Sequence, residues 1–188
     1  LDGLSEWYRK LRNTARFLLG NLADFDPTAH TRANTTLLAV DAYVLAQVDD
    51  LVARVKDAYE RYEFHVAHRA IVEFVTVTLS ALYGDVVKDR TYCDAKDAPR
   101  RRAAQLVQYE ALRAITLLVA PVLCFTAEDI WTHLPKRAGD PASVHVAVYP
   151  EGRRLDDGDP RVTTMQVVLA WRERVNKAIA LKGNQLRG

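Results

Sequence analysis

The feature that most constrains this chain is a long apolar stripe between residues 41 and 62. Asp41 is the residue we expect to cap the start of a helix there. The apolar residues that follow are spaced 4-3-4-3-4: Val44, Val48, Leu51, Val55, Ala58 and Tyr62. This spacing keeps all of them on one face of an α-helix about 33 Å long, so the chain must bury that face against other helices.

Similar patterns predict the rest of the helices. Residues 4–19 form an amphipathic helix with a basic face, and residues 100–119 form another that ends at Ala120-Pro121. Thr126 and Asp129 resemble a capping box that opens a short helix ending near residue 134. A further apolar stripe predicts a helix, although its β-branched residues also fit a strand: Ile71, Val75, Thr78, Leu82 and Val86.

The last helix is expected to begin at Asp159-Pro160, an N-cap followed by proline at the first helical position. Its apolar stripe is Val168, Trp171, Val175 and Ile179. The sequence therefore predicts an all-α bundle of four or five long helices. Residues 135–159 form an irregular connection with a strand-like run at 144–148. We expect residues 1–134 to be the bundle core, and residues 135–188 to be the connection and final helix of the same domain, truncated at its C-terminus.

Charge and cysteine content limit the classes of partner. The chain has 26 basic and 24 acidic residues, so any nucleic-acid site must come from local clustering. Cys93 and Cys124 lack metal-ligand spacing, and we expect them to be buried apolar residues in a reducing cytoplasm. Apolar stretches such as residues 117–125 are shorter than the roughly 20 residues that span a bilayer, so no membrane partner is expected. Without an initiator Met, the sequence is expected to be a piece of a longer protein.

Catalytic and metal motifs are not found. No histidine follows a carboxylate at the Glu-x-x-His spacing that a di-iron bundle requires. His65 and His68 share a helical face, for which an ordinary helix pair is favoured over a weak metal site. Glycine-rich phosphate loops and a Gly-x-Ser-x-Gly elbow are missing too. The sequence therefore favours a binding module with no catalytic residue and no metal.

Basic clusters are the positive signal. Arg9, Arg12 and Arg16 are spaced i, i+3, i+7 and share one helical face with Tyr8 and Asn13. Other clusters lie in residues 88–92, 100–102 and 161–188. Arginine and lysine attract RNA phosphates, and aromatic rings stack on unpaired bases. A solvated charged face is the alternative interpretation.

Several segments, in order, resemble a known family. These segments are residues 8–27, 59–65, 88–92, 101–105, 120–131 and 143–145. Together they resemble the anticodon-binding domain of isoleucyl-tRNA synthetases. Valyl relatives share the bundle, but the runs Arg-Asn-Thr-Ala-Arg-Phe-Leu-Leu-Gly-Asn-Leu and Lys-Asp-Arg-Thr-Tyr fit the isoleucine members best.

The resemblance implies a function for the parent protein and for this piece. The parent is expected to be a monomeric cytoplasmic isoleucine–tRNA ligase that uses ATP and Mg²⁺. This helical domain is expected to grip the anticodon stem-loop of isoleucine tRNA and to contact the parent's own catalytic domain. The His-Ile-Gly-His and Lys-Met-Ser-Lys-Ser signatures are missing from the sequence, so we expect no cofactor and no catalysis in this segment. The alternatives are the valyl-tRNA synthetase domain and a non-catalytic helical interaction scaffold.

The resemblance also assigns tRNA-binding residues. They are Tyr8, Arg9, Arg12, Asn13, Arg16, Lys88, Arg90 and Tyr92. For Tyr8 the alternative is packing in the core, for Asn13 a hydrogen bond between helices, and for residues 88–90 a local ion pair. Packing roles are expected for Phe64, Pro121, Phe125 and Trp131.

Overall fold

The computed structural model describes residues 2–154 and 158–185. Its long helices are α1 (Asp2–Asn21), α2 (Ala39–Glu60), α6 (Pro99–Val119) and α8 (Pro160–Gln185). Shorter elements are α3 (Phe64–Glu73), the π-helix η1 (Phe74–Tyr83), α4 (Gly84–Val86), α5 (Lys88–Tyr92), α7 (Cys124–His133) and the 3₁₀ turn η2 (Val144–Val146). This confirms the all-α bundle that the stripes predict.

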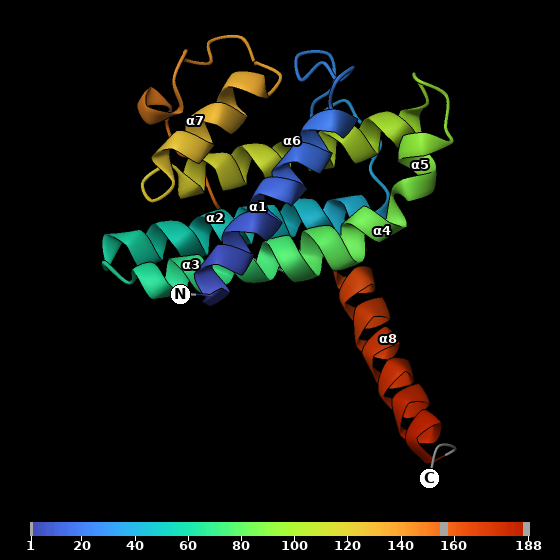
Figure 1. Cartoon of the computed structure of the whole chain (residues 1–188). Coiled ribbons are helices and arrows are strands. Elements are labelled where there is room, and N and C mark those ends of the chain that lie inside the picture. The colour runs from blue at the N-terminus through green and yellow to red at the C-terminus, as the bar shows by residue number, and fades with distance from the viewer. Residues whose placement is uncertain (1, 155–157, 186–188) are drawn as a thin grey trace.

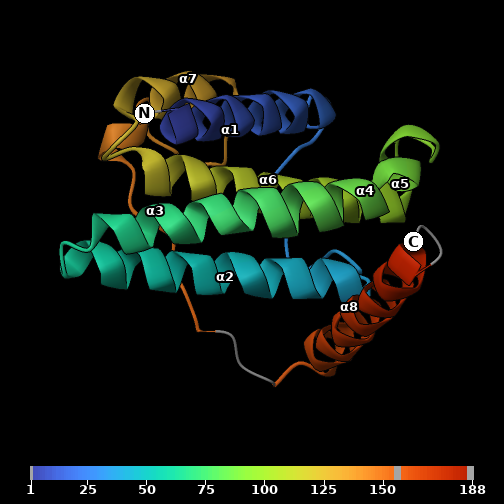
Figure 2. The same cartoon turned by 60° about the horizontal axis from the view of Figure 1, so that its bottom comes forward.

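The helices form stacked layers around α6. In Figure 1, α2 and the continuous run α3–η1–α4 form an antiparallel hairpin, and α1 lies across the bundle. Figure 2 shows α1 and α7 together on one side of α6, with α3 and α2 on the other. Nearly every residue of α6 from Arg102 onward is buried. A helix that is buried on all sides occupies the centre of its domain.

Two helices begin earlier than the sequence predicts. Leu38, not Asp41, is the cap of α2, and the Asp41 carboxylate accepts a hydrogen bond from the Leu38 N–H at 3.0 Å. Helix α7 begins at Cys124, so Thr126 lies in its first turn and is not the cap. The Thr126 hydroxyl is engaged with another helix instead, as described below.

The third apolar stripe is helical, but its register differs from the prediction. The buried row is Ile71, Val75, Leu79, Tyr83 and Val87, whereas Thr78, Leu82 and Val86 are not buried. A π-helix bonds residue i to i+5 and so has a wider turn than an α-helix, which shifts the buried positions to a spacing of four. The Ser80 hydroxyl accordingly donates to the Val75 carbonyl at 2.7 Å.

By length and composition, the 23-residue stretch Phe64–Val86 is also apolar enough to cross a membrane, since an 18-residue window within it has a mean hydropathy of 1.2. It is the one such helical stretch in the described part of the chain. In this structure it packs against α2 and buries its apolar row in the bundle core. The core helix of a bundle can be this apolar without contacting lipid.

The strand-like run at 144–148 is not a strand. Residues 144–146 form the turn η2, and none of the described residues is in a β-strand. The Glu128 carboxylate of α7 accepts hydrogen bonds from the Val144 N–H and the Ser143 hydroxyl, both at 2.9 Å. This segment is therefore held by α7 and not by a neighbouring strand.

The start of α8 follows the prediction, but its packing does not. Asp159 Oδ1 accepts a hydrogen bond from the Arg161 N–H at 2.9 Å, which confirms the expected cap. Val162 is buried near α2. The next two turns still pack against α2, with Met165, Gln166 and Leu169 half-buried, and the helix then projects away from the bundle (Figure 1). The predicted stripe of Val168, Trp171, Val175 and Ile179 is at least half exposed.

Several packing predictions are wrong for individual side chains. Cys93 and Cys124 are both exposed rather than buried. Phe64, Pro121 and Phe125 are exposed as well, because Pro121 lies in the α6–α7 turn and the two phenylalanines lie at the first residues of α3 and α7. Trp131 is fully buried, as predicted, and its indole N–H donates to the Pro141 carbonyl at 3.1 Å.

Candidate nucleic-acid interface

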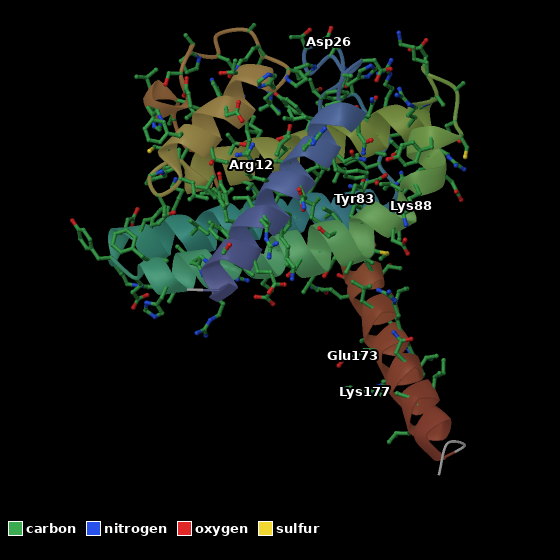
Figure 3. The ribbon with its side chains drawn as sticks, viewed as in Figure 1. Arg12, Asp26, Tyr83, Lys88, Glu173 and Lys177 are labelled. Atoms are coloured by element: carbon green, nitrogen blue, oxygen red, sulfur yellow. The ribbon has the colours of Figure 1, made fainter. Side chains whose placement is uncertain are left out.

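Helix α1 presents a basic face to solvent. Leu11, Ala15 and Leu18 are buried in the core at a spacing of four and three, which fixes the rotation of the helix. The opposite face carries the exposed side chains of Arg9, Arg12, Asn13 and Arg16. Figure 3 shows Arg12 on this face, where α1 crosses the bundle.

Tyr8 has a structural contact within this face. Its half-buried side chain shares a hydrogen bond of 3.1 Å with the Thr126 hydroxyl of α7. Arg12 Nη1 donates to the Tyr8 hydroxyl at 3.3 Å. The hydrogen bonds from Thr126 and then from Arg12 lower the pKa of Tyr8 below its ordinary value. Tyr8 therefore ties α1 to α7 and orients the Arg12 guanidinium.

Within the described residues, the arginines of the α1 face form no ion pair with a carboxylate, although Glu6 acts on Arg9 and Asp129 acts on Arg12 through weaker electrostatic attraction. Arg9 and Arg16 form no hydrogen bond or ion pair with any residue that the structure describes, and Arg12 bonds only to Tyr8. By contrast, most arginines elsewhere in the bundle pair with Asp or Glu. The guanidinium groups on α1 are therefore free to bind an external anion.

A groove runs beside this face, between α1 and the run η1–α4. It has a volume of about 300 Å³, and the buried side chains of Leu18 and Leu79 line it. The exposed side chains of Asn13 and Phe17 border it on the α1 side, and Lys88 borders it on the α5 side. The structure thus brings Asn13 and Lys88 to one hollow from distant parts of the sequence.

Lys88 is held beside the groove by a short-range ion pair. Its ammonium donates to the Asp85 carboxylate at 2.7 Å, and this hydrogen bond raises the pKa of Lys88. The same bond lowers the pKa of Asp85, with a smaller contribution from Arg172 of α8. Both Lys88 and Asp85 are well exposed, and such pairs are weak. Lys88 therefore remains available to an anion.

Tyr92 lies over the C-terminal end of α1. Its exposed side chain donates a hydrogen bond to Asn21 Oδ1 at 3.4 Å. Asn21 in turn donates from Nδ2 to Gln108 Oε1 of α6 at 2.9 Å. This chain of contacts places an exposed aromatic ring beyond the groove, on the same side as Lys88.

Arg90 is expected from the sequence to be a tRNA-binding residue, but it does not face the solvent. Its guanidinium is buried and donates two hydrogen bonds to the Asp41 carboxylate. The Tyr83 hydroxyl donates to the same carboxylate at 2.7 Å. Burial and then the Asp41 charge raise the pKa of Tyr83 well above its ordinary value. The ion pair considered within residues 88–90 does not form. Lys88 pairs with Asp85 instead, and Arg90 pairs with Asp41.

The basic cluster at residues 100–102 is mostly internal as well. Arg101 donates to both oxygens of Asp24 at 2.8 and 3.0 Å, and Arg102 lies 3.5 Å from the same carboxylate. These contacts, led by the Arg101 hydrogen bond, lower the pKa of Asp24 to about 2. Neither ion pair is predicted from the sequence: Asp24 is not singled out there, and Asp41 is expected only as a helix cap. Acidic residues next to predicted helix ends are a signal for such pairs.

Of the two histidines of α3, His65 is exposed and His68 is half-buried. Within the described residues, no group of three or more His, Cys, Asp or Glu side chains is placed to hold a metal ion. His68 packs edge-on against Trp7 of α1, with ring centres 4.6 Å apart. Its role there is packing between α1 and α3.

Comparisons with known proteins agree with the sequence resemblance. Residues 41–185 match the family model of the anticodon-binding domain of tRNA ligase. The chain is 42% identical to isoleucine–tRNA ligases of Geobacter sulfurreducens and Syntrophotalea carbinolica, over 95% and 98% of its length. It is 41% identical to that of Bacillus cytotoxicus over 98% of its length. In each case it spans about a fifth of the relative, 19% or 20%.

Proposed function

The chain belongs to the family of anticodon-binding domains of tRNA ligases, and on this premise we propose that its α1 face binds the anticodon stem-loop of isoleucine tRNA. The observation that carries the proposal is the set of unpaired cations on α1, Arg9, Arg12 and Arg16, beside a groove bordered by Lys88. Cations without internal partners gain the most from contact with a phosphate backbone, because binding releases the counterions of the RNA.

The groove suits an unpaired base of the anticodon loop. Loop bases in RNA are recognised by stacking on flat side chains and by hydrogen bonds to their polar edges. Phe17 offers an exposed aromatic ring at the groove, and the free amide of Asn13 offers one donor group and one acceptor. Lys88 and Tyr92 would then contact the phosphate and an adjacent base. Arg90 supports this surface from inside the bundle and does not touch the RNA.

We infer that the intact protein is a cytoplasmic isoleucine–tRNA ligase, in which this region is the tRNA-recognition part. ATP and Mg²⁺ would act in the catalytic part of that protein, since the nucleotide-site signatures do not occur in this sequence. The support for isoleucine over valine is the identity of about 40% to isoleucine–tRNA ligases.

The test of this proposal is to titrate the chain against isoleucine and valine tRNA transcripts at a fixed salt concentration and to measure binding by fluorescence anisotropy. We expect tighter binding of the isoleucine transcript. Equal binding of both would support phosphate contact without anticodon recognition, and tighter valine binding would overturn the assignment.

A further inference from the structure

Helix α5 is too short to hold its own position. It has five residues, Lys88–Tyr92, and an isolated helix of this length is unstable in water. Other parts of the bundle must therefore hold it in place. The buried pair of Arg90 with Asp41 fixes one side of α5. A second set of contacts fixes its C-terminal end, where the exposed ring of Tyr92 lies.

The first of these contacts is made by Asn21, the last residue of α1. Its Oδ1 accepts a hydrogen bond from the Tyr92 hydroxyl at 3.4 Å, and its Nδ2 donates to Gln108 Oε1 at 2.9 Å. Gln108 is buried, and within the described residues its side chain has no other hydrogen bond. Because an amide carries its nitrogen and oxygen on opposite sides, the bond to Gln108 turns the Asn21 oxygen towards Tyr92. The Tyr92 side chain remains 62% exposed, so its ring is still open to a ligand.

Arg101 of α6 holds the backbone at the same place. Its Nε donates to the Thr91 carbonyl at 3.4 Å, and the last carbonyls of a helix lack partners within the helix. Its Nη1 donates to the Lys96 carbonyl at 2.9 Å, in the turn that follows α5. Both Nη atoms also donate to the Asp24 carboxylate, just beyond the end of α1. One guanidinium therefore bonds three separate segments.

Gln105 of α6 joins the two sets of contacts. It is fully buried, and its Nε2 donates to the Asn21 carbonyl at 2.8 Å and to Asp24 Oδ1 at 2.7 Å. Figures 1 and 2 both place α5 at the end of the bundle towards which α1 runs. The contacts at the ring and at the backbone of α5 thus belong to one network that connects α1, α5 and α6.

We propose that Asn21 and Arg101 are positioning residues for RNA recognition, which hold the Tyr92 ring in place as a platform on which an unpaired base stacks. An aromatic ring that is fixed before binding loses less conformational freedom when a base stacks on it, so the complex is tighter than with a mobile ring. The hydroxyl of Tyr92 is used inside the domain, and the face of the ring is what the RNA contacts. This inference rests on the proposed function, because it takes this side of the bundle as the RNA interface.

Tyr92→Phe is the variant that tests the proposal most cleanly. It keeps the ring and removes only the hydroxyl that bonds Asn21, at an exposed position where the fold tolerates the change. Titration with the isoleucine tRNA transcript should show binding about three- to tenfold weaker than for the wild type. The dependence of binding on salt should be unchanged, because no phosphate contact is lost. The matched control is Tyr62→Phe, at an 80% exposed tyrosine in the α2–α3 turn, which should bind like the wild type.

The variant Asn21→Ala and its combination with Tyr92→Phe show how the hydroxyl acts. If the hydroxyl works through Asn21, the double variant should bind no more weakly than the weaker of the two single variants. Additive losses would mean that the hydroxyl contacts the RNA itself, and wild-type binding by Tyr92→Phe would mean that the ring needs no fixing. Either result overturns the proposal. Failure of the proposed function is distinguishable, because it appears in the wild-type chain as tighter binding of the valine transcript.

Arg101→Lys tests the backbone contact without RNA. Lysine keeps the positive charge beside Asp24, but its ammonium cannot bond three segments at once. Hydrogen–deuterium exchange, followed by mass spectrometry, should be at least about tenfold faster in residues 89–94 than in the wild type. The matched control is Arg100→Lys, because Arg100 forms only an exposed pair with Asp94, and its exchange should match the wild type. Unchanged exchange in residues 89–94 of the Arg101→Lys variant would also overturn the proposal.

Discussion

Arg90 and Asp41 form a buried, two-pronged ion pair, with N···O distances of 2.9 Å for Nη1–Oδ2 and 2.8 Å for Nη2–Oδ1. Asp41 is in the first turn of α2 and Arg90 is in α5, so the pair joins the start of the hairpin to the segment that carries Lys88 and Tyr92. Tyr83 completes the network with its hydrogen bond to Asp41.

Replacing Arg90 by alanine should destabilise the fold strongly. The substitution leaves the Asp41 carboxylate buried without its cation, which typically costs about 3–5 kcal/mol. Urea denaturation followed by circular dichroism measures this change in the free energy of unfolding. Arg12→Ala is the matched control, and we expect its effect to be below about 0.5 kcal/mol because Arg12 is exposed. Equal stabilities for the two variants would show that the buried pair does not matter.

A second prediction distinguishes the observed register of the π-helix η1 from the register expected for an α-helical stripe. Leu79 is buried and Leu82 is not, although the sequence pattern favours Leu82. Leu79→Ala should therefore lower the free energy of unfolding by about 2–4 kcal/mol, and Leu82→Ala by about 1 kcal/mol or less. Thermal or urea unfolding of both variants provides the comparison. A larger effect at Leu82 would support an ordinary α-helix through this segment.

Asp24 gives a pH dependence with a defined sign. Its pKa is about 2 in the folded protein, below the ordinary value of 3.8, so its pairing with Arg101 favours the folded state at neutral pH. This contribution is complete above about pH 4 to 5 and is lost as the pH falls towards 2. We expect Asp24→Asn to be less stable than the wild type by roughly 1–2 kcal/mol at pH 7, allowing for partial solvent exposure. The difference should shrink in urea titrations at pH 3; a difference that is constant with pH would assign the effect to packing.

The sequence predicts the helices well because their signal is local. Apolar residues at a helical spacing locate α1, α2 and α6, and Asp159-Pro160 locates the start of α8. The change to a π-helix in η1 has no such local signal, because the apolar spacing of this segment also fits an α-helix. The same limit explains the exposed stripe on α8, because an apolar face predicts that a partner exists but not that it lies within the same bundle.

The same difference between local and distant signals applies to the site residues. Helical spacing is enough to place Arg9, Arg12 and Arg16 on one face, and the structure agrees. Spacing cannot predict that Arg90 pairs with a carboxylate 49 residues earlier in the chain. A cation in a basic segment therefore looks the same in sequence whether it faces solvent or supports the core. The role of each interface residue in RNA binding stays a prediction.

The most direct test of the central claim is the salt dependence of tRNA binding by variants of the α1 face. The double variant Arg12→Ala/Arg16→Ala removes two free cations, and Arg61→Ala/Arg100→Ala removes two exposed cations that are paired with carboxylates elsewhere. Because the two variants lose the same charge, the comparison isolates position from net charge. Both should melt close to the wild-type temperature.

The measured quantity is the slope of the logarithm of the association constant against the logarithm of the salt concentration, for isoleucine tRNA. Each lost phosphate contact should flatten the slope by roughly 0.7 to 0.9, so the α1 variant should lose about 1.4 to 1.8 in slope. It should also bind about 1–3 kcal/mol more weakly, and the control variant should match the wild type. If both variants retain the wild-type slope, or if both lose it equally, the α1 face is not where this domain holds its tRNA.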